Sequence, residues 1–141
     1  MTTPVTRPRK IPRRRKEHYL IIAVDFDGVL WQGKFPKIGP PNYEMISLVR
    51  ELIDNGNEVV LWTTRNGAEL DAAVRWCDDR GLHFCAVNEP APSNAAEYAD
   101  RYPTQSRKIY ADIYIDDHNM ETIYCGQDTL IKCIRRLLHH E

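Results

Sequence analysis

The stretch Leu20–Leu30, LIIAVDFDGVL, decides the fold of this chain. Five aliphatic residues run directly into Asp25-Phe26-Asp27-Gly28, and an apolar run of this length predicts a strand buried on both faces, as in the middle of a parallel sheet. The two carboxylates then leave the core at the carboxyl end of the strand, where open α/β sheets bind their ligands. Strand alternation points Asp25 and Asp27 the same way, and Gly28 permits a sharp turn and close approach of a ligand to the backbone. Taken alone, the segment also fits a strand followed by an ordinary acidic turn.

The rest of the chain alternates patterns typical of helices and strands. Apolar residues at helical spacing predict helices over residues 43–54, 67–80 and 128–138. Short apolar runs predict further strands at 58–62, 83–87 and 113–115. Proline and glycine mark 31–42 as a loop or small flap, and 88–107 as irregular apart from a turn of helix around 95–99. Right-handed crossovers between such strands predict an α/β fold, namely a three-layer, Rossmann-like parallel sheet with helices on both faces.

Length and composition favour one soluble globular domain. The 141 residues are 43% hydrophobic and 28% charged, and we expect residues 19–141 to form this domain behind a basic tail at 1–18. No apolar run approaches the roughly 18 residues of a membrane span, so no membrane contact is expected. The four cysteines show no C-x-x-C spacing, and three lie in apolar segments. Reduced core thiols in a cytoplasmic protein are therefore expected rather than a zinc site.

The charge of the chain is distributed unevenly. Residues 1–16 hold seven basic residues and no acidic one, which leaves 12 basic against 20 acidic residues in the remainder, so the two parts carry +7 and −8. Three prolines keep the tail from forming a helix, and we expect it to be disordered in isolation. Contact with nucleic-acid phosphates through residues 7–16 is the functional interpretation. The alternatives are a localisation signal, a solvated arm that aids solubility, or an arm that rests on the acidic body.

Polar side chains stand where successive predicted strands end. Asp25 and Asp27 follow the first strand, Thr63 follows the second, and Asp116 and Asp117 follow the last. The carboxyl ends of parallel strands share one edge, so residues 91 positions apart in the chain can converge there. Gathered carboxylates repel one another and raise one another's pKa unless a hard cation joins them, and a few oxygen ligands favour Mg²⁺.

Two further residues would complete a site for a phosphoryl group. Lys108 lies shortly before the last strand, and with Thr63 it would supply the positive charge and the hydroxyl donor that phosphoryl oxygens need. Each residue alone also has an ordinary interpretation: a strand-end hydroxyl, a solvated surface lysine, or an acidic pair that caps a helix or turn. Their joint placement in this order favours the site.

Four segments in this order resemble the motifs of the haloacid dehalogenase superfamily of phosphatases and related hydrolases. They are Asp25-Phe26-Asp27-Gly28-Val29, Thr63 closing VVLWT, Lys108 in SRKIYAD, and Asp116-Asp117 in IYIDDHN. FPKIG at 35–39 and IDDHN at 115–119 are similar to segments of small capless bacterial and phage members. The resemblance covers about residues 19–120 and implies the core of that superfamily without a cap domain.

The resemblance also implies roles for the acidic residues. Asp25 would be the nucleophile that forms an aspartyl-phosphate, and Asp27 would protonate the leaving alcohol and then activate water. An aspartate at this second position is similar to the phosphatases rather than to the ATPase or dehalogenase branches. Mg²⁺ would be held by the carboxylates of Asp25 and Asp116 and by the backbone carbonyl of Asp27, with Asp117 a ligand through water or an orienting residue.

The remaining motif residues would act on the phosphoryl group. Thr63 and Lys108 would bind it, and Lys108 would also screen Asp25 from its acidic neighbours. The chain departs from the family pattern at His118, where relatives often carry a basic residue. That departure concerns the rim of the site rather than the reaction.

The spacing of the motifs leaves no room for a cap, because 36 positions separate Asp27 from Thr63 and 45 separate Thr63 from Lys108. An open site suits a phosphate on a macromolecule, or a small substrate covered by a neighbouring subunit of a homo-oligomer. Trp31 would stack on a base or sugar or else pack on its own domain, and Arg65 would contact a second substrate charge or else pair with a surface carboxylate. Together the candidate substrate-binding residues are Gly28, Trp31, Thr64, Arg65 and Asn88.

The sequence therefore predicts a Mg²⁺-dependent phosphomonoesterase, and the basic tail favours a nucleotide or a nucleic-acid end as the phosphorylated substrate. One alternative is a module that holds phosphate without hydrolysing it, which the presence of both Asp25 and Asp27 disfavours. Another is a nucleic-acid-associated protein that acts through its basic arm.

Overall fold

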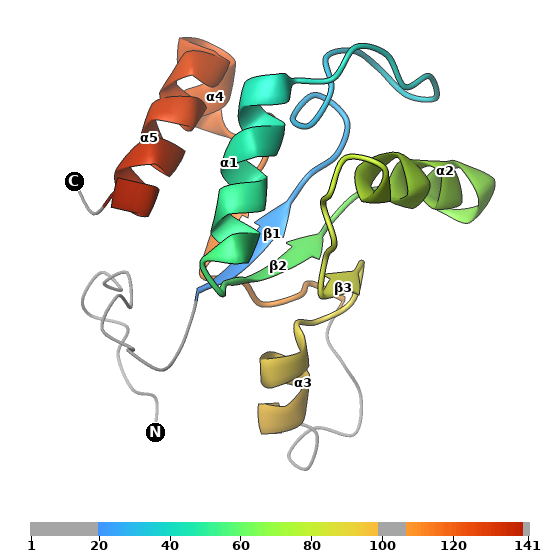
Figure 1. Cartoon of the computed structure of the whole chain (residues 1–141), viewed down its shortest axis with the longest axis vertical. Helices are drawn as coiled ribbons and strands as arrows, with labels where there is room; N and C mark the ends of the chain where they lie inside the picture. Colours follow the sequence, from blue (N-terminus) through green and yellow to red (C-terminus); the bar gives the residue numbers. More distant parts are fainter. Residues whose placement is uncertain (1–19, 99–106, 140–141) are drawn as a thin grey trace.

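The computed structural model describes residues 20–98 and 107–139 of the chain. The predicted basic tail and part of the irregular segment at 88–107 lie outside these described residues. Figure 1 shows the arrangement of the described elements around a small central sheet.

The sheet confirms that the Leu20–Leu30 stretch forms the central strand. β1 (Ile21–Val24) is buried along its whole length and pairs on one side with β2 (Glu58–Leu61) and on the other with β4 (Ile113–Ile115). β3 (Ala86–Val87) pairs with β2 at the edge. All pairings are parallel and the strand order is β3-β2-β1-β4. β3 is shorter than the predicted strand at 83–87, because the ladder with β2 includes just its last two residues.

The helices follow the predicted order, with one addition. They are α1 (Tyr43–Asp54), α2 (Gly67–Asp78), α3 (Pro92–Tyr98), α4 (Met120–Cys125) and α5 (Gln127–His139). The side chain of Asn42 caps α1 by accepting a hydrogen bond from the amide of Met45. The sequence did not predict α4, although Asn119 caps it in the same way by accepting from the amide of Thr122.

The two faces of the sheet are covered unequally. The larger core cluster joins Ile22, Val24 and Leu61 to buried residues of α1, α2 and α5, and Figure 1 shows α1 lying in front of β1 and β2. On the other face a smaller cluster joins Ala23 and Val60 to Ala91 and the segment 109–111.

The strand order explains this difference. The connections through α1 and α2 both step in the same direction across the sheet, so right-handed crossovers place them on one face. The connection from β3 to β4 steps back, and its described part contributes the seven-residue α3. The α/β class and the parallel sheet are therefore confirmed, whereas the predicted cover of helices on both faces is met unevenly within the described residues.

The cysteines depart from the sequence prediction. Cys77 of α2 is a buried core thiol, and burial raises its pKa to about 12. Cys85, Cys125 and Cys133 are exposed, so the prediction of core thiols is wrong for them, because the short apolar segments that contain them present these positions to solvent. All four cysteines are free. Within residues 20–98 and 107–139, no helix is long and apolar enough to span a membrane.

Because β1 lies in the centre of the sheet, truncating its side chains is expected to destabilise the fold strongly. Ile22 is fully buried, and Ile22→Ala should lower the free energy of unfolding by about 2–5 kcal/mol in urea denaturation. Tyr43→Ala is the matched control, because Tyr43 is 75% exposed and its truncation should change stability by about 0.5 kcal/mol or less. Equal losses in the two variants would contradict the central position of β1.

Candidate active site

The register of the sheet brings the ends of β1 and β4 together. Val24 pairs with both Leu61 and Ile115, and the amide of Asp25 then donates to the carbonyl of Ile115 over 2.9 Å. Asp25 therefore lies beside Asp116, which follows Ile115 directly. The strand order reverses between β1 and β4, and such a reversal is where open α/β sheets form their ligand crevice.

Three carboxylates, Asp25, Asp116 and Asp117, gather at this point. Burial raises the pKa of Asp25 most, the negative charges of Asp116 and Asp117 raise it further, and together they bring it to about 8. Burial also raises the pKa of Asp117, and the neighbouring Asp116 adds to the effect. Asp25 and Asp117 are thus penalised for being charged, which is the electrostatic problem that a bound cation relieves.

The position of Asp117 supports a cation site. Its Oδ1 atom is buried and has no hydrogen-bond partner among the described residues. A Cβ atom placed on Gly28 would stand 2.2 Å from Asp117 Oδ2, so the glycine is required for this carboxylate to approach the first loop. The ligand atoms that Asp116, Asp117 and His118 can offer lie within 4.8 Å of one another. Crowded carboxylate oxygens with one atom unsatisfied fit a hard divalent cation such as Mg²⁺.

Asp27 has a different environment from Asp25. Its carboxylate accepts hydrogen bonds from Arg65, with Nη2 at 2.7 Å from Oδ1 and Nε at 2.9 Å from Oδ2, and from Trp31 Nε1 at 2.9 Å. We call this arrangement of Asp27, Arg65 and Trp31 the arginine clamp. The sequence prediction placed Asp27 with the acidic cluster, whereas the charge that faces its carboxylate is positive.

Arg65 is held from several sides. It is 3% exposed, its guanidinium lies 5.0 Å from the ring centroid of Phe26 and 5.1 Å from that of Phe35, and its Nη2 also donates to the carbonyl of Lys37 over 3.0 Å. Phe35 and Lys37 belong to the loop at residues 31–41, so Arg65 connects this flap to the first motif. Because the guanidinium of Arg65 is buried, water does not solvate its charge. Removing the Asp27 carboxylate would therefore leave a buried charge without compensation and destabilise the fold.

These contacts decide between the alternatives that the sequence left open for Trp31 and Arg65. Trp31 is 3% exposed and its indole N–H is occupied by Asp27, so it packs on its own domain and is not available for stacking on a substrate base. Arg65 pairs with Asp27 of the first motif, whose side chain is 21% exposed, rather than with an exposed surface carboxylate. The sequence offered one signal for this pair, an arginine two residues beyond the Thr63 position at a strand end.

The remaining candidates lie near the end of β2. The amide of Trp62 donates to the carbonyl of Val24 over 2.8 Å, which places Thr63 next to the first loop. Thr63 Oγ1 accepts from the amide of Arg65 and keeps its own hydroxyl proton for a ligand. Thr64 is exposed beside it. Asn88 was expected at the substrate rim, but its Oδ1 accepts from the Thr63 amide over 2.8 Å, so it braces this turn.

Lys108 lies on the face of the sheet to which Asp25 points. Its ammonium is 5.4 Å from the ring centroid of Tyr114, and the register pairs Tyr114 with Ala23, two residues before Asp25 on the same face of β1. The side chain of Lys108 is exposed. Its contact with a phosphoryl group and its screening of Asp25 remain predictions.

The fold and the site define a protein with a four-stranded parallel α/β core and a cluster of carboxylates at its topological switch point. Among solved structures, the chain resembles a conserved protein from Bacteroides thetaiotaomicron, with 32% identical residues and a TM-score of 0.63 over 82% of this chain and 93% of that one. The chain belongs to the same family as this conserved protein. No family model matches the sequence, and no curated protein matches it.

The carboxylate cluster should make stability depend on divalent ions and on pH. Since the pKa of Asp25 in the folded state, about 8, lies above its ordinary value of 3.8, the folded state binds more protons between these values. Without metal, the free energy of unfolding should therefore fall as the pH rises from 4 to 8. Mg²⁺ at a hundred times its Kd should raise it by about 2.7 kcal/mol at pH 8. Thermal melts with EDTA and with Mg²⁺ measure both effects.

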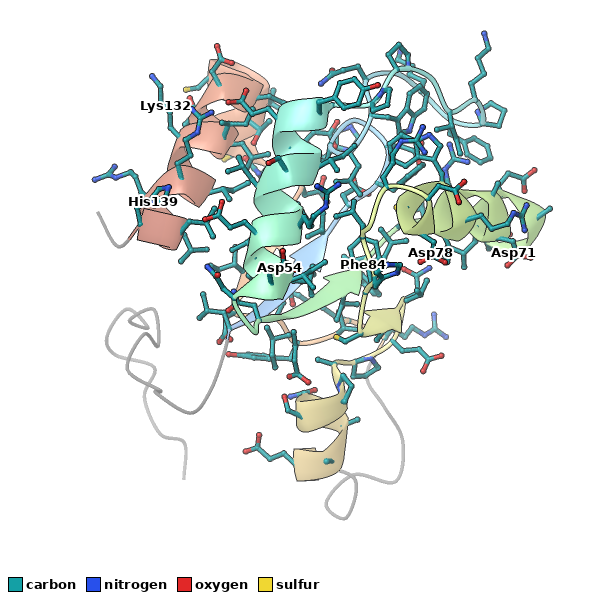
Figure 2. All side chains as sticks on the ribbon, in the orientation of Figure 1. Asp54, Asp71, Asp78, Phe84, Lys132 and His139 are labelled. Carbon is teal, nitrogen blue, oxygen red and sulfur yellow. The ribbon has the colours of Figure 1, made fainter. Side chains whose placement is uncertain are left out.

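The variant Asp117→Asn tests which group produces these effects. It removes one of the negative charges beside Asp25, so it should raise the melting temperature in EDTA at pH 8 and abolish the stabilisation by Mg²⁺. Asp71→Asn is the control, because Asp71 is exposed on α2 (Figure 2), and it should leave both responses unchanged. A full Mg²⁺ response in Asp117→Asn would exclude Asp117 from the metal site.

Proposed function

We propose that this protein is a Mg²⁺-dependent phosphohydrolase of the phosphomonoesterase type, acting through an aspartyl-phosphate at Asp25. The observation that carries the proposal is the convergence of Asp25, Asp116 and Asp117 at the reversal of strand order, where the buried Asp117 Oδ1 accepts no hydrogen bond from the described residues and has His118 Nδ1 3.8 Å away. Membership of the haloacid dehalogenase superfamily is part of the same proposal. It is supported by the four motifs, of which three close strands of one parallel sheet and the fourth, Lys108, precedes β4.

Asp25 is suited to act as the nucleophile. Its backbone is fixed by the hydrogen bond from its amide to the carbonyl of Ile115, and its Oδ1 accepts from the amide of Phe26 over 2.8 Å. One carboxylate oxygen is thereby oriented, and the other can attack phosphorus. Thr63, with its hydroxyl proton available, would bind an oxygen of the transferring phosphoryl group, and Lys108 would approach from the Tyr114 side.

The acidic cluster would hold Mg²⁺ through the carboxylates of Asp25 and Asp116 and the backbone carbonyl of Asp27, with Asp117 as a further ligand or an orienting group. When bound, the ion neutralises the gathered carboxylates and the phosphoryl oxygens, so that an anion can approach an anionic nucleophile. A module that holds phosphate without hydrolysing it would need neither Asp27 nor the clamp that fixes it.

The proposal predicts hydrolysis of p-nitrophenyl phosphate in the presence of Mg²⁺. Asp25→Asn removes the nucleophile while preserving the shape of the side chain, so kcat should fall on the order of 10³-fold or more. Release of p-nitrophenolate, followed by absorbance, measures the rate. Asp71→Asn is the matched control and should retain wild-type turnover, because the side chain is exposed on α2. Equal turnover by wild type and Asp25→Asn would refute the proposed reaction.

The basic tail gives a separate prediction about the substrate. If residues 7–16 bind nucleic-acid phosphates, deletion of residues 1–16 should weaken binding to single-stranded and duplex oligonucleotides and reduce its dependence on salt. Hydrolysis of p-nitrophenyl phosphate should remain unchanged. Fluorescence anisotropy at two salt concentrations measures the binding, and an unchanged affinity would remove nucleotides and nucleic-acid ends as the preferred substrate class.

A further inference from the structure

Phe35, in the middle of the flap at residues 31–41, is an aromatic side chain that the proposed reaction does not use. Its ring lies on the guanidinium of Arg65, with 5.1 Å between the Arg65 Cζ atom and the ring centroid. The fully buried Phe26 packs on the same guanidinium from the core, with a distance of 5.0 Å. Phe35 is nevertheless 55% exposed. Arg65 thus orders the ring from below, and the exposed part of the ring is available to a ligand.

The flap holds this ring in a fixed place. Its backbone is tied to the clamp, because Arg65 Nη2 donates to the carbonyl of Lys37 over 3.0 Å. It also packs closely on the buried ring of Trp31: a Cβ atom on Gly33 would stand 2.4 Å from Trp31 Cζ3, and one on Gly39 would stand 3.0 Å from the same atom. The aromatic surface is therefore preorganised, and a ligand that contacts it does not have to order the flap.

The ring of Phe35 lies near the residue that acts on the leaving group in the proposed reaction. The carboxylate of Asp27 accepts from Arg65 Nη2 over 2.7 Å, so the carboxylate and the ring share one guanidinium. The ring centre is consequently within about 9 Å of Asp27 Oδ1. A leaving group with its ester oxygen beside Asp27 can reach the ring across a sugar or a short linker.

We infer that Phe35 determines the specificity of this site, and that the leaving group of the substrate carries a planar aromatic ring that stacks on it. This inference rests on the proposed function and names its substrate class. Lys34 and Lys37 are exposed on either side of Phe35 in the chain, so positive charge adjoins the aromatic surface. Aromatic side chains among basic residues are a common surface for stacking nucleobases. The stacking position is Phe35 rather than Trp31, whose ring the flap covers.

The experiment compares pairs of phosphate monoesters that differ in the ring alone, using the full chain with Mg²⁺. Adenosine 5′-monophosphate and ribose 5-phosphate differ by the nucleobase. Phenylpropyl and cyclohexylpropyl phosphate differ by the planarity of the ring, and they test an aryl group without a nucleoside. Release of inorganic phosphate gives kcat/KM for each compound. We expect the planar member of a pair to exceed its partner by about 5- to 150-fold, the range that stacking on an aromatic side chain gives. A preference in the first pair alone assigns the ring to a nucleobase, and a preference in both pairs to aromatic groups in general.

Variants of Phe35 connect this preference to the ring. Phe35→Leu keeps an apolar side chain on Arg65 and removes the aromatic face, so the ratio of kcat/KM within a pair should fall towards one. Phe35→Trp supplies a larger aromatic face and should retain the preference. Tyr124→Leu is the matched control, because Tyr124 is an aromatic residue that is 81% exposed on α4 rather than on the flap. Its ratios should equal those of the wild type.

The outcomes separate this inference from the proposed function. Wild-type ratios near one in both pairs, with turnover of the compounds, would overturn the inference and leave the phosphohydrolase intact; this comparison needs no variant to fold. A loss in Phe35→Leu that is equal for both members of a pair would show that the ring merely supports the flap, and it would also overturn the inference. Failure of the wild type to hydrolyse any of these esters or p-nitrophenyl phosphate would overturn the proposed function, and the inference with it.

Discussion

The parallel pairing of β1 between β2 and β4 is the constraint on which the rest of the structure depends. The amide of Asp25 completes the ladder with β4 by donating to the carbonyl of Ile115, and the carbonyl of Val24 accepts from Trp62 at the end of β2. These hydrogen bonds join backbone atoms, and they bring Asp25, Thr63 and Asp116 to one edge of the sheet. The hydrophobic burial of β1 fixes the register, since a slip of one residue would turn every buried side chain to the opposite face.

The same pairing creates an electrostatic cost at the edge. Asp25, Asp116 and Asp117 are brought close together, and burial with the neighbouring negative charges opposes the ionisation of Asp25 and Asp117. Apolar side chains or side chains of opposite charge at these positions would make the fold more stable. The carboxylate cluster therefore lowers the stability of the fold, and a bound cation would offset this loss. Gly28 contributes to this crowding, because its missing side chain lets the carboxylate of Asp117 approach the first loop. A divalent cation would convert this cost into affinity.

Much of the fold could be predicted from the periodicity of apolar residues in the sequence, whereas the arginine clamp could not. Residues 43–54 and 113–115 have the predicted bounds because their apolar spacing and flanking turn residues are local signals. The convergence of strand ends also followed, because parallel topology makes it general. Arg65 and Trp31 could not be placed, since their partner depends on how the flap at 31–41 folds back over Phe26, and that is decided by tertiary packing. The short α4 was missed because its apolar residues are exposed and give no amphipathic pattern.

Asp25 and Asp27 are two positions apart, yet the structure surrounds one with negative charge and the other with positive charge. A pattern of motifs alone assigns the two residues to one acidic centre. The surroundings of the two residues instead differ: Asp25 lies beside other carboxylates, whereas the carboxylate of Asp27 is paired with Arg65. Pairs of carboxylates in opposed environments commonly take different roles in catalysis. Here the difference is made by Arg65, a residue outside the first motif, so the surroundings of the two carboxylates are set by the flap and by the segment after β2 as much as by the Asp-x-Asp segment.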